Sequence, residues 1–287
     1  MMRRYAQILF SILLLLVPFG PIVTAPPSQA YVLHGYHLLE LMRREMGTAR
    51  SLEVIQKLTI HESILPTEAV AVQETLSYLF PVAFRSEFAS AAGAHTHIFS
   101  NGRALTVVDR QIVSDTESEL DRYKDIFLFN TRELLKNRLL QLGVAVDVSS
   151  VGRFQGRIAY VLGAQYPDET VPQLWLDKQT FRPMRWLLKP ASTINLSEAI
   201  EVRYDNWRKV SSIWYPERIE FYQGDRLLRR MQVQRTRVNP KLSNRLFDVA
   251  YLKSIYPNAA APPPAQGESG GKNDIQHTID RFRKLLE

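Results

Sequence analysis

Residues 199–238 read AIEVRYDNWRKVSSIWYPERIEFYQGDRLLRRMQVQRTRV. Three runs within this stretch are rich in β-branched and aromatic residues, a composition typical of strands, and they are Ala199–Trp207, Arg218–Gln223 and Leu227–Val238. The turn Gln223-Gly224-Asp225 joins the last two runs. Strands with such short connections pair antiparallel, so the stretch predicts a meander.

The strand pattern continues upstream of this stretch. Leu52–Ile60 alternates with a period of two, and Asn101-Gly102 is a strong hairpin signal. Further strand-like runs lie at 71–80, 82–90, 94–100, 104–113, Val144–Val148, Gly156–Ala164, Gln173–Asp177 and Pro183–Lys189. The chain is therefore predicted to be mainly β.

Two helical regions interrupt the strands. His37–Met46 carries an apolar stripe and is followed by Gly47, which favours the end of a helix. The second region covers about 118–142, where Asn130 and Glu133 resemble a capping box. The predicted fold class is thus β with helices.

The first thirty residues have the features of a signal peptide. Arg3 and Arg4 precede ten residues, Ile8–Val17, of which only Ser11 is not apolar. This apolar run is shorter than a membrane span, and Ser28-Gln29-Ala30 places small residues at a cleavage site. We expect cleavage after Ala30 and a location in the periplasm, with an uncleaved anchor as the alternative.

The other end of the chain changes composition after Tyr256. Residues 257–273 are rich in Pro, Ala, Gly and Ser and are predicted to form a flexible linker. Residues 274–287 are predicted to form a short amphipathic helix. The helix is too short to be stable alone in water, so it is expected to dock on the main domain at 31–256, on a partner or on a membrane.

Charge and cysteine content limit the class of protein. Removing Arg3 and Arg4 lowers the net charge from +7 to +5, which is too little to indicate a nucleic-acid binder. The chain has no cysteine, so it has neither disulfides nor a site for a lipid-modified N-terminal cysteine. We therefore expect a free, soluble protein.

Enzyme and metal signatures are weak. The sequence contains no Gly-x-Ser-x-Gly elbow, P-loop or Gly-x-Gly-x-x-Gly. His61-Glu62 begins like a zincin motif, but Leu65 stands where the second histidine belongs. His95 and His97 share one strand face without an evident further ligand, so strand histidines are favoured over a metal site. We expect no catalysis, no metal and no cofactor.

The predicted second group of strands carries more apolar side chains than one covered face requires. All four tryptophans of the chain lie there, at 175, 186, 207 and 214. Several of these strands are apolar on both faces, as in Leu174-Trp175-Leu176. Two interpretations remain open at this point: packing on both faces, or one face that lines a cavity or contacts a partner.

Several segments between Leu38 and Val249 together resemble the LolA/LolB-like periplasmic outer-membrane lipoprotein carriers. The likeness rests on the opening helix followed by Leu52–Ile60, Phe80–Glu87, Pro172–Trp186, Tyr204–Val210, Trp214–Ile219, and the closing Val238-Asn239-Pro240 and Leu246-Phe247-Asp248. The resemblance implies a curved, incomplete antiparallel β-barrel, a half-barrel closed by helices, with an apolar cavity for acyl chains.

The resemblance also implies a function. The chain would carry lipoproteins or other lipids from an inner-membrane donor to an outer-membrane acceptor without catalysis. The alternative is an envelope sensor or protein-interaction module with the same fold. Cavity candidates are Leu174, Leu176, Trp186, Leu188, Ile219, Phe221 and Arg85. In the family's carriers an arginine before a proline latches the lid, whereas here Phe80 precedes Pro81, so release is expected to differ.

Overall fold

A computed structural model describes four segments of the chain, residues 32–61, 69–90, 93–188 and 199–258. The chain divides into two compact units, Met1–Tyr31 and Val32–Glu287, and the second is described by itself. The predicted signal peptide and C-terminal helix, and all of the predicted linker but its first two residues, lie outside the described residues. Within the described segments, no helix is long and apolar enough to cross a membrane.

The described strands form one antiparallel sheet of 13 strands in the order β6-β5-β4-β3-β2-β1-β13-β12-β11-β10-β9-β8-β7. The sheet stays open, because β6 and β7 are its two edges. The first six strands are β1 (Ser51–His61), β2 (Ala69–Leu79), β3 (Ala83–Ser90), β4 (Gly93–Ser100), β5 (Arg103–Val108) and β6 (Gln111–Ser114). The other seven are β7 (Ala145–Phe154), β8 (Arg157–Gly163), β9 (Gln173–Asp177), β10 (Pro183–Leu188), β11 (Ile200–Val210), β12 (Ile213–Gln223) and β13 (Arg226–Val238).

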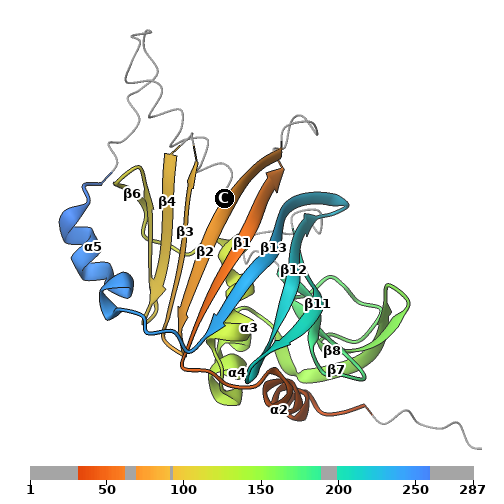
Figure 1. Ribbon diagram of the computed structural model, residues 1–287. Helices are drawn as coiled ribbons and strands as arrows, with labels where there is room; N and C mark the ends of the chain where they lie inside the picture. Colours follow the sequence, from red (N-terminus) through yellow and green to blue (C-terminus); the bar gives the residue numbers. More distant parts are fainter. Residues whose placement is uncertain (1–31, 62–68, 91–92, 189–198, 259–287) are drawn as a thin grey trace, which may run out of the picture. The chain divides into compact units, whose positions relative to one another are not determined.

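The helical segments lie on both faces of this sheet. They are α2 (Gly35–Met46), η2 (Glu119–Lys124), α3 (Asp125–Leu128), α4 (Arg132–Gln141), η4 (Asn244–Phe247) and α5 (Val249–Ile255). Figure 1 shows α3 between the two halves of the sheet, and aromatic contacts of η2 and α3 reach both β3 and β12. The predicted incomplete antiparallel barrel with helices is therefore confirmed.

The inner face of the sheet holds the main core. Alternate residues of each strand point to this face, as the two-residue period of a strand requires. Buried apolar side chains of α2, η2, α3 and α4 belong to the same cluster as those of the strands. On the outer face, α5 packs over β4, β5 and β6, where Val249 and Leu252 meet Ile98, Leu105 and Val107.

A third cluster explains why the second group of strands is apolar on both faces. Trp175 and Met184 lie in a small core on the outer face, together with Ala159, Val161 and Ala164. The Arg185 guanidinium stacks over the Trp175 ring at 5.2 Å. The pairing of β10 with β9 shifts between Pro183 and Arg185, which brings Met184 to the outer face although it shares parity with Trp186.

The structure corrects some local predictions. Thr131, not Asn130, caps α4, and its hydroxyl accepts a hydrogen bond from the Leu134 amide at 3.3 Å. The strand predicted from Arg218 begins earlier, at Ile213. The helix α5 was not predicted, because seven residues give too short a pattern, although Val249, Leu252 and Tyr256 have helical spacing.

Candidate functional site

Part of the inner face of the sheet is covered by residues 117–130, which we call the cover segment and which contain η2 and α3; α2 and α4 pack on the same face. Tyr123 and Phe127 of this segment point into the interior. The Tyr123 ring lies 5.5 Å from that of Phe221, and the Phe127 ring lies 4.8 Å from that of Tyr215. The Tyr204 hydroxyl donates to the Tyr123 carbonyl at 3.1 Å. The interior is thus aromatic and filled by the segment that covers it.

A buried lysine ties the cover segment to its surroundings. Lys124 has no exposed side-chain surface, and its ammonium contacts the Glu117 carboxylate, the Asp121 carbonyl at 3.0 Å and Asp125 Oδ1 at 3.4 Å. The ammonium also lies 4.8 Å from the centroid of the Phe99 ring. Burial alone would lower the pKa of Lys124, but the neighbouring carboxylates raise it, so the group is charged at neutral pH.

Arg138 of α4 completes this buried ion cluster. Its Nε donates to Asp125 Oδ2 at 2.6 Å, and its guanidinium also contacts Glu117. Burial raises the pKa of Glu117, but Lys124 and Arg138 outweigh burial and bring it down to about 2. The cover segment is therefore attached through charges as well as apolar packing.

Arg43 of α2 holds the other end of the cover segment. Its guanidinium donates to the carbonyls of Ile126 at 3.0 Å and Asn130 at 3.1 Å, and more weakly to that of Gly47 at 3.5 Å. It has no carboxylate partner among the described residues. Burial lowers the pKa of Arg43 to about 10, so it remains protonated at neutral pH. Arg43 thus attaches the cover segment to α2. In the family's carriers the latching arginine precedes a proline, a position that Phe80 occupies in this chain.

Replacing Arg43 tests this attachment. Arg43→Met keeps the apolar stem but leaves the Ile126 and Asn130 carbonyls without their donor, and we expect the free energy of unfolding to fall by about 1–2 kcal/mol. Urea denaturation measures this loss, and Arg44→Met, at an exposed position on the same helix, is the matched control. Equal stabilities of the two variants would contradict the latch.

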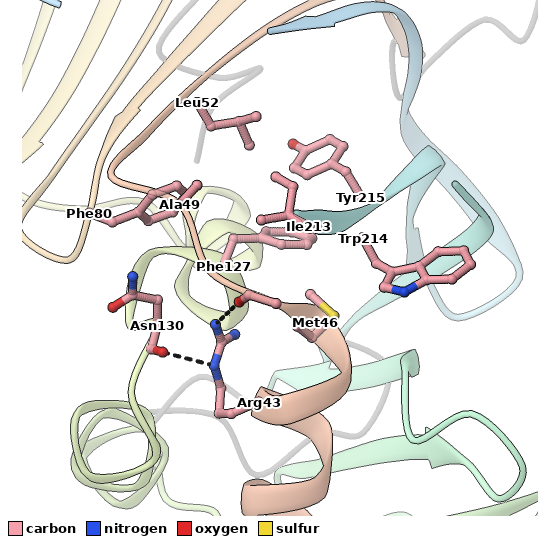
Figure 2. A pocket seen from close by; sticks show the side chains of 11 residues that line it. Arg43, Met46, Ala49, Leu52, Phe80, Phe127, Asn130, Ile213, Trp214 and Tyr215 are labelled. Carbon is pink, nitrogen blue, oxygen red and sulfur yellow. Dashed lines mark hydrogen bonds between the residues drawn. The ribbon is translucent and has the colours of Figure 1, made fainter. Parts of the chain in front are cut away.

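A small cavity lies beside this latch. It holds about 20 Å³, room for about one water molecule, and is enclosed by Arg43, Leu52, Phe80, Phe127 and Tyr215, among others. Figure 2 shows the Arg43 guanidinium with its hydrogen bonds to the carbonyls of Asn130 and Gly47, and the rings of Phe80, Phe127 and Tyr215 around the cavity. The cavity touches both the cover segment and the first strand, so it marks a point where the interior is imperfectly filled.

A much larger groove lies beside α4 and the cover segment. It has a volume of about 670 Å³, and its apolar lining includes Val82, Phe99, Phe129 and Leu134. Val82 and Leu134 are 40% and 38% exposed. Because Glu117 and Phe129 also line this groove, it borders the cover segment near both of its ends.

The six apolar cavity candidates all lie on the inner face. Each is at most 1% exposed, and all belong to the main core cluster: Leu174, Leu176, Trp186, Leu188, Ile219 and Phe221. Phe221 directly contacts Tyr123 of the cover segment. They are therefore brought together on one wall, although in this state the wall is packed against other side chains.

Arg85 lies elsewhere. Its neighbour Phe84 points into the main core, so Arg85 faces outward, where it donates to the Leu246 carbonyl at 2.8 Å and to Glu87 at 2.5 Å. Arg85 thus ties η4 to the outer face of β3. Arg85 was predicted to line the cavity, but it lies on the outer face, because successive side chains of a strand point to opposite faces.

A polar layer crosses the interior on β13, β1, β2 and β3, and sequence reasoning missed it. Glu74 is fully buried and accepts hydrogen bonds from Gln56 at 2.6 Å and Ser86 at 2.5 Å, with Arg229 3.5 Å away. These residues are far apart in sequence and lie on four different strands, so no local pattern signals the layer. The layer gives an otherwise apolar interior a set of buried charges.

The two strand histidines point into this interior. His97 Nδ1 is 2.9 Å from the Thr106 hydroxyl, and its Nε2 is 3.5 Å from Asp121 of the cover segment. The His95 ring stacks on Phe88 with 4.7 Å between the ring centroids. Within the described residues, no group of three or more potential metal ligands occurs. The structure thus places His97 against the cover segment.

Comparison with known proteins identifies the fold. No family model and no curated protein match the sequence. The chain is similar to the crystal structure of a LolA superfamily protein from Nitrosomonas europaea, with 12% identity and a TM-score of 0.54 over 77% of this chain and 100% of that chain. It is also similar to a domain from Vibrio parahaemolyticus described as outer membrane lipoprotein-sorting, with 12% identity and a TM-score of 0.51 over 76% of this chain and 98% of that chain. At such identities the likeness concerns the fold alone, and on that level this chain has the fold of the LolA superfamily structures.

Proposed function

We propose that the protein binds acyl chains of lipids or lipoproteins in the interior beneath the cover segment and moves them through the periplasm toward the outer membrane. The observation that carries this proposal is an aromatic and apolar interior closed by one short segment with polar attachments. Such a segment can leave as a unit while every strand keeps its hydrogen-bonded neighbours. The fold likeness supports the proposal.

The energy of acyl-chain burial offsets much of the cost of displacing the cover segment. Transfer of a chain of about 14 methylene groups out of water gains roughly 11 kcal/mol. Exposing the buried apolar side chains of the segment, which are Leu120, Tyr123, Ile126, Phe127 and Leu128, costs roughly 1.5–3 kcal/mol each. A bilayer offers an acyl chain similar burial, so cargo exchanges between protein and membrane, as a carrier requires, and direction depends on donor and acceptor proteins.

The wall of the proposed site consists of Leu174, Leu176, Trp186, Leu188, Ile219 and Phe221. No catalytic group is needed there, because the proposed work is burial and release. Export with cleavage after Ala30 and a periplasmic location belong to the same proposal, as does the role of a non-enzymatic carrier without metal or cofactor.

Tryptophan fluorescence tests the position of the bound chain. Trp186 faces the main core, whereas Trp175 on the neighbouring strand faces the small outer core. Two variants retain only one of these tryptophans, with the other three replaced by Phe, and each is titrated with a dibrominated stearate, whose bromine atoms quench on contact. We expect the fluorescence of Trp186 to fall and that of Trp175 to stay unchanged, provided both variants still melt cooperatively.

The packed interior favours one rival function. A cavity of about 20 Å³ beside a filled wall also suits an interaction module that never opens. That function predicts no stearate binding by the wild type and no quenching of either tryptophan. Equal quenching of both tryptophans would instead indicate adsorption on the surface and would contradict the acyl site.

A further inference from the structure

The groove beside α4 has a mixed lining, in which apolar side chains lie between polar and charged ones. Its lining from α4 comes from Leu134, Arg138 and Gln141, which are spaced to share one helix face, and Val82 and Phe99 close it from the sheet. Val82 and Leu134 give this groove exposed apolar surface that a further apolar side chain can cover.

The course of the chain after α5 leads toward this groove. The Ile112 amide donates to the Pro257 carbonyl at 2.8 Å, so the last described residues run along the edge strand β6. Lys253 contacts Asp115 at 3.1 Å, and Asp115 itself lines the groove. Residues 259–287 therefore begin close to the groove.

The sequence of that terminal segment carries an apolar stripe that suits the groove. Ile275, Ile279, Phe282 and Leu286 have the spacing i, i+4, i+7, i+11, which aligns them in one narrow apolar stripe if the segment is helical. The last turns also carry Arg281, Arg283 and Lys284. Asp115 at the rim of the groove already pairs with Lys253, so the proposed contact rests on the apolar stripe.

We infer that residues 275–286 dock as a helix in the α4 groove of their own chain. A helix of this length is marginal in water alone and needs an apolar partner. The linker of about 15 residues spans roughly 20–25 Å and keeps the helix at an effective concentration in the millimolar range, so docking within the chain outcompetes other copies. Because the groove borders both ends of the cover segment, the docked helix braces that segment, a role beyond the binding of acyl chains.

Disulfide trapping tests this contact cleanly, because the chain has no cysteine of its own. Leu285→Cys lies beside the apolar stripe and is paired with Leu134→Cys, which lines the groove. The matched control pairs Leu285→Cys with Leu140→Cys, a 47% exposed position on the same helix that does not line the groove. The two cysteines are separated by nearly the same length of chain in both pairs, so random collision would form the two disulfides at equal rates. All are full-length proteins under mild oxidation, and the product is read on non-reducing gels.

Docking predicts that the Leu134–Leu285 pair cross-links within one chain about tenfold faster than the control pair, or more. Adding Ile279→Asp and Phe282→Asp should remove the difference, because each places a charge in the apolar contact. Equal rates for the two pairs would overturn the inference, and so would a fast pair that these two substitutions do not slow. Disulfide-linked dimers in place of intramolecular products would also overturn it. None of these outcomes depends on whether the protein binds lipid.

Discussion

Lys124→Met is expected to lower the free energy of unfolding by about 3–5 kcal/mol. The substitution keeps a side chain of similar length but leaves Glu117 and Asp125 with Arg138 as their remaining cation. Both carboxylates lie in or at the edge of the core, where an uncompensated charge is costly. Lys57→Met, at an exposed position of β1, is the matched control and should change stability by less than about 0.5 kcal/mol.

Hydrogen exchange of the backbone amides measures which part of the chain loses stability in Lys124→Met. If the cover segment opens as a unit, a loss of about 3 kcal/mol raises its opening equilibrium more than hundredfold, while the amides of β1 keep their protection. Adding Asp125→Asn to Lys124→Met removes one of the stranded charges and should recover part of the stability. A Lys124→Met variant as stable as the control would show that the ion cluster does not hold the segment.

The sequence predicted the sheet well because strands carry local signals. Gln173–Asp177 was bounded correctly at both ends, since apolar residues fill it and turn residues flank it. Alternation also separated Leu174 and Leu176 from Trp175, which the structure assigns to the inner and outer clusters. The segments that pack on each face could not be predicted, because alternation separates the two faces of a strand but does not show which part of the chain lies against each face.

The sequence analysis did not predict the contacts that attach the cover segment, those of Arg43 and Lys124. Arg43 lies four residues after Leu39 and three before Met46, and this spacing on the apolar stripe of α2 was an available signal that the arginine is buried. Lys124 gave no such signal, because Glu117 lies before η2 and Arg138 lies on a separate helix, α4, so the three residues meet only through the fold. Charged residues in a predicted helix are normally solvated, so only tertiary contacts reveal a buried ion cluster.

Acid is expected to destabilise the protein through His95. The ring is buried on the inner face, both of its nitrogens lack a hydrogen-bond partner, and it faces His97, Asp121 and Arg229. Burial, reinforced by His97 and Arg229 against Asp121, lowers the pKa of His95 to about 3. The unfolded chain binds this proton at a pKa of about 6.5, so below that pH the unfolded state holds more protons and the free energy of unfolding falls.

His95→Phe should remove this sensitivity. An aromatic ring of similar shape keeps the stack on Phe88 and cannot titrate. Relative to their difference at pH 7.5, we expect the variant to gain about 2 kcal/mol over the wild type at pH 5 and about 3 kcal/mol at pH 4, as measured by urea denaturation. His37→Phe, at an exposed site, should follow the wild-type curve. Parallel curves for His95→Phe and the wild type would show that His95 carries its proton when folded. Burial of the charged ring would then be fully offset, with Asp121 as the neighbouring group that favours the charged form.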